Sequence, residues 1–275
     1  MNWRRLRLGL LTVTGLARRG FFIPYRYAGG IADRQPVYAE IEALLEKHAP
    51  AFEQTLALID GFAAPLEALS GSPPAPRWAQ DWFPRADGAA AYTMVRHHQP
   101  ARVIEVGSGH STRFMAQAVA DQNLSCAITA IDPAPRATID ALPVQVIRQP
   151  VQQVGNEVFS TLTAGDVLFI DSSHLLMPGT DVDVLFNRVL PQLPAGVFVH
   201  IHDIFLPDDY PAAWSWRGYN EQLAVTALLQ GGGFAPLWSS RYVLTRMKEQ
   251  VSRSVLARLP LQDGAFESSL WLRKL

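Results

Sequence analysis

Acidic and histidine side chains stand at two points where short apolar runs of the sequence end. Asp171 and His174 follow the run VLFI, and His202 and Asp203 follow the run VFVHI. Carboxylate and imidazole groups can move protons near neutral pH, and both can bind divalent metal ions. A carboxylate at the end of a buried strand also needs a partner, because burying it unpaired costs free energy. We therefore expect Asp171, His174 and His202 to be catalytic residues.

A second informative stretch is RVIEVGSGHST at residues 102–112, where an apolar run enters a glycine turn that opens a helix. Gly107 and Gly109 permit positive φ angles and let a ligand approach the backbone closely. The helix start beyond them offers unpaired N–H groups to a nucleotide-type ligand. Asp132 ends the next apolar run, 25 residues after Gly107. That spacing suits a carboxylate that accepts hydrogen bonds from the hydroxyls of a ribose.

Two cofactor classes use this geometry, and single residues distinguish them. A dinucleotide-binding fingerprint has glycine where this chain has Thr112, whereas here an acid, Glu105, precedes Gly107 by two positions. The stretch resembles the pattern E-x-G-x-G-x-G of class I S-adenosylmethionine-dependent methyltransferases, with Ser111 in place of the third glycine.

The resemblance extends over roughly residues 80–275. The segments GDVLFIDSSH and VFVHIHDIFLPDDYP are similar to a bacterial subgroup related to macrolide-sugar O-methyltransferases and cephalosporin hydroxylase-like proteins. The resemblance implies S-adenosylmethionine as cofactor, with Glu105 facing its methionine amino group and Asp132 its ribose. The residues expected to bind the cofactor are Glu105, Gly107, Ser108, Gly109, Ser111 and Asp132.

The resemblance also suggests a site for a divalent cation, magnesium or manganese. In metal-dependent O-methyltransferases an acid after the fourth strand and an acidic or amide pair after the fifth hold the metal. Asp171, His202 and Asp203 fall on these positions. Magnesium prefers oxygen ligands, so a coordinating histidine would shift the preference toward manganese, iron or zinc. Alternatively, one histidine is the general base and no metal binds.

Neighbouring polar and aromatic residues have simpler interpretations. We interpret His200 as a buried, hydrogen-bonded histidine, and Asp208 and Asp209 as solvated loop charges. The segment LPDDYPAAWSWRGYNEQ at residues 206–222 follows the fifth strand and could close over the methyl acceptor. Three of its aromatic side chains could stack on the apolar face of a sugar or ring: Trp214, Trp216 and Tyr219.

The elements that position these residues alternate between strand and helix. We expect strands at residues 102–106, 127–131, 144–147, 167–170, 197–201, 234–238, 242–244 and 269–273, and helices at 110–120, 181–190 and 216–229. Strands this apolar occur where helices cover both faces of a sheet. The pattern predicts an α/β fold with a doubly wound, mainly parallel sheet. The methyltransferase resemblance implies seven strands, the last of them antiparallel.

Helices also dominate the part of the chain before the alternation. Apolar residues at spacings of three and four predict two helices between Gln35 and Leu69, separated at Pro50. The segment GSPPAP at residues 71–76 is a stiff linker. We therefore predict a basic arm and helical extension at residues 1–75 and a methyltransferase domain at residues 76–275.

The first segment is basic and partly apolar. Six arginines and no acid precede Asp33. The apolar run from Leu8 to Ala17 is too short to span a bilayer, and no small-residue cleavage site follows it. We expect an arm that docks on the domain or frays, with peripheral membrane contact through residues 1–30 as the alternative.

The whole chain has 275 residues, about half of them hydrophobic, and a formal net charge of -1. That composition supports a sizeable core and gives no overall drive toward nucleic acid. The catalytic part also lacks an N-P-P-Y-type motif and a basic stripe, so a nucleic-acid substrate is not expected. The single cysteine, Cys126, excludes a disulfide framework and fits a cytoplasmic protein. A homo-oligomer is left open.

These observations favour a methyltransferase that O-methylates a hydroxylated small molecule or a sugar-containing acceptor, with or without a divalent metal. Two alternatives stay open at this point. One is an NAD-dependent oxidoreductase with a Rossmann domain. The other is a non-catalytic scaffold that binds a cofactor or a membrane.

Overall fold

The computed structural model describes residues 3–32, 37–135 and 138–275. It divides the chain into two units, Met1–Gln35 and Pro36–Leu275. The predicted boundary at residue 75 therefore falls inside the larger unit. The predicted helix start at Gln35 lies outside the described residues.

The smaller unit contains the helix α1 (Trp3–Val13) and a short 3₁₀ helix, η1 (Ala28–Gly30). No residue of α1 is buried. Among the described residues, no helix is both long enough and apolar enough to cross a membrane.

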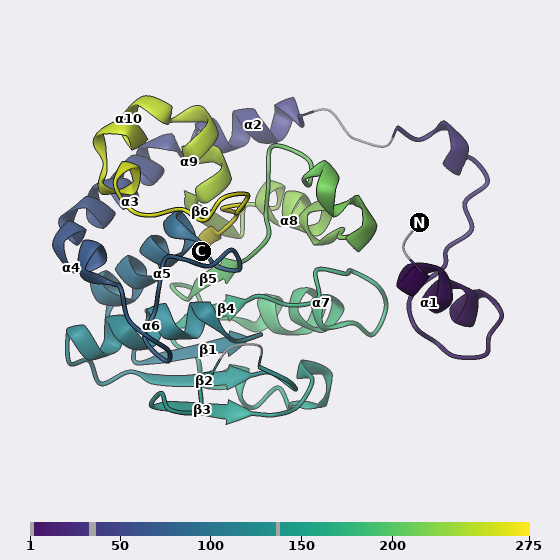
Figure 1. Cartoon of the computed structure of the whole chain (residues 1–275), viewed down its shortest axis with the longest axis horizontal. Coiled ribbons are helices and arrows are strands. Elements are labelled where there is room, and N and C mark those ends of the chain that lie inside the picture. The colour runs from purple at the N-terminus through teal and green to yellow at the C-terminus, as the bar shows by residue number, and fades with distance from the viewer. Residues whose placement is uncertain (1–2, 33–36, 136–137) are drawn as a thin grey trace. The chain divides into compact units, whose positions relative to one another are not determined.

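A seven-stranded sheet forms the centre of the larger unit (Figure 1). Its strands are β1 (Arg102–Val106), β2 (Ala127–Ile131), β3 (Val144–Ile147), β4 (Val167–Ile170), β5 (Phe198–Ile201), β6 (Phe234–Ser239) and β7 (Leu270–Lys274). The strand order is β3-β2-β1-β4-β5-β7-β6, in which the first five strands pair in parallel and β7 runs antiparallel to β5 and β6. The predicted doubly wound, mainly parallel seven-stranded sheet is confirmed.

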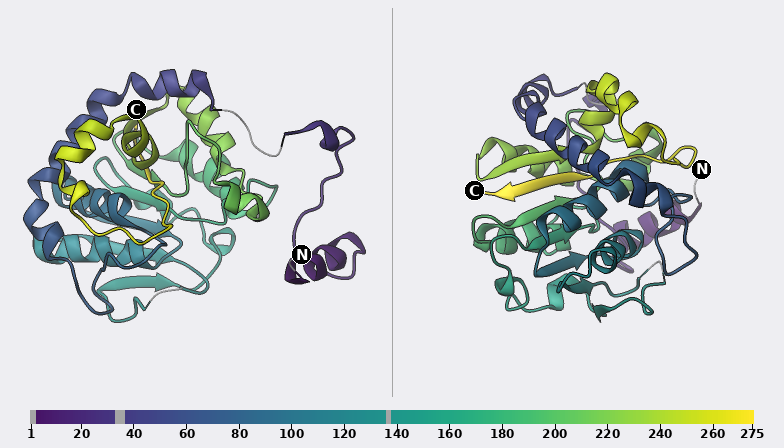
Figure 2. Two further views of the ribbon diagram at one scale, coloured as in Figure 1. Left: turned by 45° about the horizontal axis from the view of Figure 1, so that its top comes forward. Right: turned by 90° about the vertical axis from the view of Figure 1, so that its left-hand side faces the viewer.

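Helices cover both faces of this sheet. They are α2 (Ala39–Glu46), α3 (Ala49–Gly61), α4 (Ala63–Ala68), α5 (Arg85–His98), α6 (His110–Asp121), α7 (Asp181–Val184), α8 (Glu221–Gln230), α9 (Ser240–Arg246) and α10 (Lys248–Arg253). α5 and α6 pack together on one face, and α7 and α8 lie on the other (Figure 2). β4 and β5 are consequently buried along their whole length.

The helical extension belongs to the same core as the sheet, which explains why the boundary does not fall at the GSPPAP linker. Ile41, Leu45 and Phe52 are buried in this core. The hydroxyl of Thr55 in α3 donates a hydrogen bond to the carbonyl of Leu237 in β6. The apolar faces of these helices are buried against the α/β part of the unit, so α2 to α4 form no separate domain.

Two predicted elements are wrong. The helix expected at residues 216–229 begins only at Glu221. A 3₁₀ helix, η6 (Ala212–Arg217), precedes it, and Gly218 ends that helix with a left-handed φ angle of 68°. The strand expected at residues 242–244 is part of α9. The Ser239 side chain accepts a hydrogen bond from the backbone N–H of Tyr242 and so caps that helix.

The strand order reverses direction between β1 and β4, and this reversal positions the site. Helices leave β1 and β4 toward opposite faces, so the carboxyl ends of these strands border a crevice that no helix covers. The glycine loop at residues 107–109 and Asp171 both follow strands at this edge.

Candidate active site

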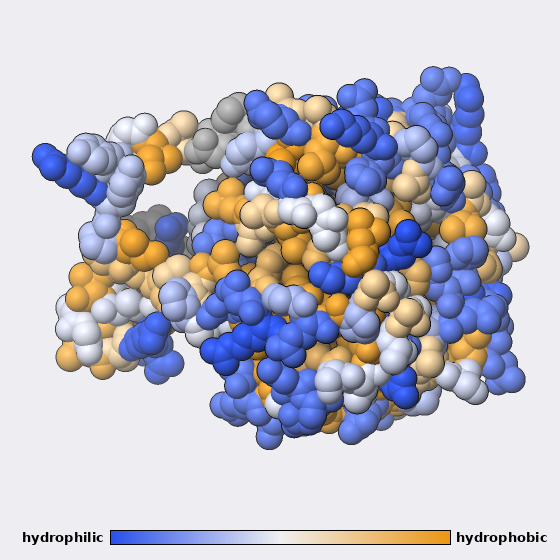
Figure 3. Space-filling view, turned by 180° about the vertical axis from the view of Figure 1, so that it is seen from behind, coloured by the Kyte–Doolittle hydropathy of each residue, from blue (hydrophilic) through white to orange (hydrophobic). Residues whose placement is uncertain are grey.

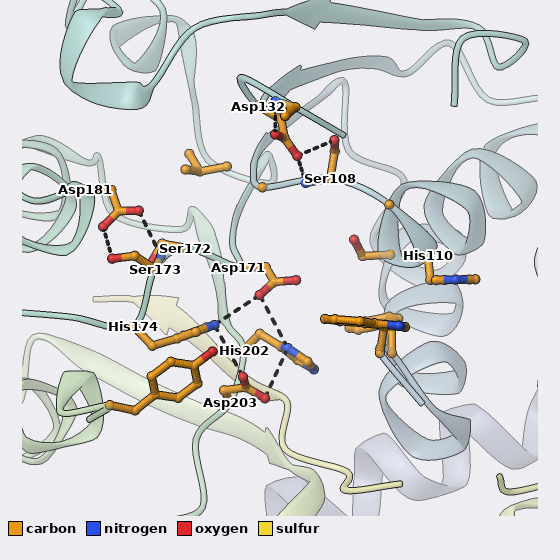
Figure 4. A pocket seen from close by; sticks show the side chains of 18 of the residues that line it. Ser108, His110, Asp132, Asp171, Ser172, Ser173, His174, Asp181, His202 and Asp203 are labelled. Atoms are coloured by element: carbon orange, nitrogen blue, oxygen red, sulfur yellow. Dashed lines mark hydrogen bonds and ion pairs between the residues drawn. The ribbon is translucent and has the colours of Figure 1, made fainter. Parts of the chain in front are cut away.

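A cavity of about 640 Å³ opens at the carboxyl edge of the parallel strands. It brings together nearly every residue that the sequence singled out, from segments far apart along the chain (Figure 4). Those that line it are Gly107, Ser108, Gly109, Ser111, Asp132, Asp171, His174, His202 and Asp203. Glu105 does not line it.

The glycine loop passes very close to the end of the neighbouring strand. Gly107 has a φ angle of +80°, and a Cβ atom placed there would lie 1.9 Å from the carbonyl oxygen of Asp171. Only glycine fits this position without backbone movement. The loop therefore brings its backbone directly beside the residue expected to do chemistry.

Asp132 is held at the rim of the cavity by the loop itself. Its Oδ2 accepts hydrogen bonds from the backbone N–H of Ser108, at 2.9 Å, and from the Ser108 hydroxyl, at 2.8 Å (Figure 4). Its Oδ1 accepts one from the N–H of Ala134 at 2.8 Å. The carboxylate is thus fixed in orientation, and it lies on the cavity wall beside the loop as a ribose-binding acid would.

Glu105 lies beneath the loop, fully buried. Its two carboxyl oxygens accept hydrogen bonds from the hydroxyls of Ser111 and Thr112. Burial raises the pKa of Glu105 to about 8, although the two hydroxyls act in the opposite direction. Thr112 also accepts a hydrogen bond from the N–H of Gly109. Glu105 therefore organises the loop from below, and its contact with a methionine amino group stays a prediction.

Four residues form a closed ring of imidazoles and carboxylates on the cavity wall: Asp171, His174, His202 and Asp203, here called the His–Asp cluster (Figure 4). His174 Nε2 lies 3.3 Å from an oxygen of Asp171 and 3.3 Å from one of Asp203. His202 Nδ1 lies 3.6 Å from Asp171 and 3.5 Å from Asp203. The cluster therefore alternates imidazole and carboxyl groups.

Two members of the cluster have unusual backbones. His174 and Asp203 have φ angles of 60° and 55°, in the left-handed region that residues other than glycine seldom adopt. Such conformations cost free energy and persist only where the surroundings enforce them, most often at functional sites. Here they turn both side chains toward the cavity directly after β4 and β5.

Two further buried carboxylates, which the sequence analysis missed, support the histidines from behind. Glu221 Oε2 lies 2.8 Å from Nδ1 of His174, and Asp87 Oδ2 lies 3.4 Å from Nε2 of His202. The other contacts of Asp87 are to the backbone N–H groups of Ser268 and Ser269. Each ring is thereby fixed between one acid behind it and the cluster in front.

These carboxylates set the protonation of the site. Burial alone would lower the pKa of His174 and of His202, but the charge of Asp203 and the contacts with Asp171 raise both well above the usual range. Burial would raise the pKa of Asp171, but the charge of His202 and hydrogen bonds from both imidazoles lower it strongly. At neutral pH the cluster thus holds two imidazolium groups around an ionised Asp171.

The proposed cation ligands Asp171, His202 and Asp203 do come together in this cluster. Their donor atoms nevertheless face one another as ion pairs. Within residues 3–32, 37–135 and 138–275, no three or more His, Cys, Asp or Glu side chains are arranged to hold a metal ion.

Aromatic side chains of the segment after β5 form another wall of the cavity. Trp214 and Tyr219 line it, and Tyr219 packs against the ring of His174 with centroids 4.6 Å apart. Arg217, which the sequence analysis did not single out, also lines it and stacks on Trp214, 4.2 Å from the ring centroid. Trp216 does not line the cavity and is 57% exposed.

Three other residues show what the sequence pattern could and could not indicate. His200 is fully buried and bonded to the Ser269 hydroxyl, as expected. Asp208 is not a solvated loop charge, because it accepts hydrogen bonds from the guanidinium groups of Arg241 and Arg246. His110 lines the cavity as a neutral imidazole, since burial lowers its pKa to about 4.

One protein-family model matches part of this chain. A family model described as a methyltransferase domain matches residues 104–204, which contain the glycine loop, Asp132 and the His–Asp cluster. No curated protein matches the sequence significantly.

Several solved structures are similar to this one. An SAH-bound methyltransferase from Podospora anserina has 15% identity and a TM-score of 0.45 over 93% of this chain and 99% of its own. An O-methyltransferase from Bacillus cereus in complex with SAH has 12% identity and a TM-score of 0.41 over 91% and 96%. A structure of cmcI with Mg and SAM has 14% identity and a TM-score of 0.37 over 67% and 68%.

The third glycine of a dinucleotide fingerprint is absent, and the Thr112 side chain that replaces it bonds to the loop. Residues 104–204 match a methyltransferase domain, and they lie in a unit whose sheet has the strand order β3-β2-β1-β4-β5-β7-β6.

Proposed function

We propose that this chain is an S-adenosylmethionine-dependent methyltransferase that acts on a hydroxyl oxygen of a small molecule that carries a sugar or another ring. One observation carries the proposal: the glycine loop, Asp132 and the His–Asp cluster all line the same cavity. A methyl donor held by the loop and a hydroxyl held at the cluster would therefore meet within one enclosed space.

The residues of the loop fit the cofactor. Gly107, Ser108 and Gly109 line the cavity with small or absent side chains, and the fixed carboxylate of Asp132 can accept hydrogen bonds from ribose hydroxyls. When bound, S-adenosylmethionine would supply a methyl group from a positively charged sulfur, and the sulfur would be the leaving group of an in-line displacement by the acceptor oxygen. The chain's own task is then to align the acceptor, exclude water and remove a proton.

Asp171 is the residue best suited to take that proton. Its side chain is 34% exposed, whereas those of His174, His202 and Asp203 are between 4% and 8% exposed. The hydroxyl proton becomes strongly acidic as the oxygen–methyl bond forms, so a carboxylate with a lowered pKa can accept it. The proton that the acceptor hydroxyl loses would end on Asp171.

The two imidazolium groups contribute electrostatically. They hold Asp171 ionised and lie beside the oxygen on which negative charge would develop if the proton left early. His174 and His202 therefore act in our proposal as charge-stabilising groups at neutral pH, and Asp171 acts as the base.

The aromatic wall supports a ring-bearing acceptor. Trp214 and Tyr219 present flat apolar ring faces to the cavity. A polar group lies beside them, because the Arg217 guanidinium donates a hydrogen bond to the Tyr219 hydroxyl at 2.9 Å. Sugars and phenolic rings combine apolar faces with polar edges in the same way.

A divalent cation at Asp171, His202 and Asp203 stays a prediction from the sequence. The donor atoms as arranged do not form a coordination site, so we derive no step through a metal. Methyl transfer measured before and after chelation, and again with added magnesium or manganese, tests it, because a loss on chelation that either ion restores would support the cation.

Calorimetric titration with S-adenosylhomocysteine tests the cofactor site directly. We expect micromolar affinity in the native chain and a loss of about tenfold or more in Asp132→Ala, because a charged hydrogen-bond acceptor is removed. Asp140→Ala is the matched control, since it removes a carboxylate that is 70% exposed and does not line the cavity. Undiminished binding by Asp132→Ala would show that the site is assigned wrongly.

A methyl-transfer screen of catechol-like and sugar hydroxyls then tests the acceptor class. Turnover that is lost in Asp171→Asn, with binding of S-adenosylhomocysteine retained, supports the proposed base. Transfer only to nitrogen or carbon acceptors would contradict O-methylation while leaving the cofactor assignment intact.

A further inference from the structure

Residues 3–31 expose an uncommon amount of apolar surface. Most of the large apolar side chains that are exposed in the described part of the chain come from this segment. They are Trp3, Leu6, Leu10, Val13, Leu16, Phe21, Phe22, Ile23, Tyr25, Tyr27 and Ile31. Contiguous apolar surface of this kind marks a contact site for another apolar phase. The methyl-transfer chemistry makes no use of it.

Four of the apolar residues of α1 lie along one side of the helix, whereas Leu8 and Leu11 lie on other sides of it. Trp3, Leu6, Leu10 and Val13 follow one another at spacings of three and four, so they share one face, here called the apolar stripe. Trp3 is 73% exposed, Leu10 56% and Val13 60%. A helix with such a stripe is stable only when the stripe is covered.

The charges of the same segment have one sign. Arg4, Arg5, Arg7, Arg18, Arg19 and Arg26 are its only charged side chains before Asp33. Because arginine is permanently ionised, the segment is strongly cationic although the whole chain has a net charge of -1. A space-filling view shows hydrophobic and strongly hydrophilic side chains next to one another over this N-terminal unit (Figure 3).

The aromatic residues after α1 repeat the combination of charge and apolar surface. The Arg18 guanidinium lies 5.3 Å from the ring centroid of Phe21, and that of Arg26 lies 5.5 Å from the ring centroid of Tyr27. Tyrosine and tryptophan favour the boundary between lipid headgroups and acyl chains, because each has an apolar body and a polar tip.

We propose that residues 3–31 dock the enzyme on an anionic lipid surface. α1 would lie in the plane of the interface, with the apolar stripe toward the acyl chains and the arginines among the headgroups. No helix in the described residues can cross the bilayer, so the contact is peripheral. Positive charge alone would also suit a nucleic acid. A nucleic acid, however, offers no apolar interior comparable to the acyl chains of a bilayer, so it would leave the apolar stripe uncovered.

Co-sedimentation of the full-length protein with vesicles tests this proposal. We expect binding to phosphatidylcholine vesicles that contain phosphatidylglycerol, weak binding to phosphatidylcholine alone, and release by salt. The variant R4Q/R5Q/R7Q should bind anionic vesicles at least about tenfold more weakly, since each arginine near such a surface adds to the attraction. The variant L6Q/L10Q should also lose binding, although its charge is unchanged.

The larger unit provides a control of equal charge. Arg148, Arg253 and Arg258 are 53%, 75% and 57% exposed, so R148Q/R253Q/R258Q removes the same charge from another surface. Equal loss of vesicle binding in this control, or no loss in the α1 variants, overturns the proposal. So does self-association by light scattering without vesicle binding, or binding to duplex DNA that L6Q/L10Q retains. Calorimetry with S-adenosylhomocysteine checks that every variant is folded, independently of acceptor and membrane.

Discussion

Nδ1 of the His174 imidazole lies 2.8 Å from Oε2 of Glu221, and both side chains are buried. The opposite nitrogen of the same ring faces Asp171 and Asp203 in the cavity. Glu221 therefore fixes the orientation of the ring from behind and helps to keep it protonated. A residue of α8 in this way sets the charge of a group that follows β4.

The first prediction concerns this pair. Glu221→Gln keeps the size of the side chain but removes a negative charge, so the pKa of His174 should fall toward its ordinary value. An NMR titration of the imidazole would measure the change. Ser172→Ala is the matched control, because Ser172 bonds to Glu221 at 3.5 Å and its loss leaves the carboxylate charged. A pKa that is the same in Glu221→Gln as in the native chain would contradict the assigned role.

The buried carboxyl of Glu105 predicts a pH dependence of stability. Its folded-state pKa is raised from 4.5 to about 8, chiefly by burial. The protonated form is therefore favoured by folding, and the associated stability is complete below pH 4.5 and is lost as the pH rises through about 8. The free energy of unfolding should fall across that window.

Glu105→Gln should make this part of the pH profile flatter, because the amide has no proton to lose. Urea denaturation at a series of pH values between 4.5 and 8 would measure the free energy of unfolding. Glu249→Gln, at a side chain that is 75% exposed, removes an acid without burial and should leave the profile as it is. Identical profiles for the two variants would mean that Glu105 does not titrate in this range.

The glycine loop predicts a contrast between two alanine substitutions. Gly107→Ala introduces a Cβ atom 1.9 Å from the Asp171 carbonyl oxygen at a φ angle of +80°. Gly165→Ala has a similar φ angle of +93°, but nothing lies within 4 Å of its Cβ atom. We expect Gly107→Ala to lower the free energy of unfolding by about 1–3 kcal/mol and to abolish binding of S-adenosylhomocysteine. Gly165→Ala should be destabilised by the backbone strain alone and should bind normally.

Calorimetric titration together with urea denaturation separates these effects. Gly107→Ala that binds as tightly as Gly165→Ala would show that the loop can move away from Asp171 without loss of the cofactor site. Binding of the cofactor would then not depend on the close packing of the loop against the end of β4.

The features that the sequence predicts best are those formed by short continuous segments of the chain. β1 to β4 and the cofactor loop are continuous runs of a few residues, and each carries its own pattern of apolar residues and glycines. The carboxyl ends of parallel strands meet at one edge of the sheet, so the sequence also predicts that Asp171 and His202 lie close together.

The supporting acids could not be found in this way. Asp87 is 115 residues from His202, and Glu221 is 47 residues from His174, and neither follows a strand. Each lies in the first turn of a helix, where an acid needs no further explanation. The prediction that Asp208 is a solvated loop charge was wrong for the same reason. Its partners Arg241 and Arg246 belong to α9, whose residues 242–244 the pattern of apolar residues predicts as a strand.

The segment after β5 contains two tryptophans with opposite surroundings. Trp214 lines the cavity and packs against Phe205 and Phe266, with ring centroids 5.2 Å and 5.4 Å away. Trp216 is 57% exposed and does not line the cavity. The two side chains are two residues apart and equal in size, so they form a matched pair for testing acceptor binding.

Trp214→Ala should raise the KM for the acceptor roughly three- to tenfold, since an aromatic stacking surface is lost, while affinity for S-adenosylhomocysteine stays nearly constant. Trp216→Ala should change neither quantity, although it removes the same side chain from the same segment. Steady-state kinetics with an acceptor from the hydroxyl screen would measure KM, and thermal unfolding would show whether Trp214→Ala weakens the fold. Equal KM values for both variants would mean that the acceptor binds elsewhere in the cavity, closer to Arg217 or to Phe83. A rise in KM confined to Trp214→Ala would instead place the acceptor ring between that tryptophan and the His–Asp cluster, with its hydroxyl toward Asp171.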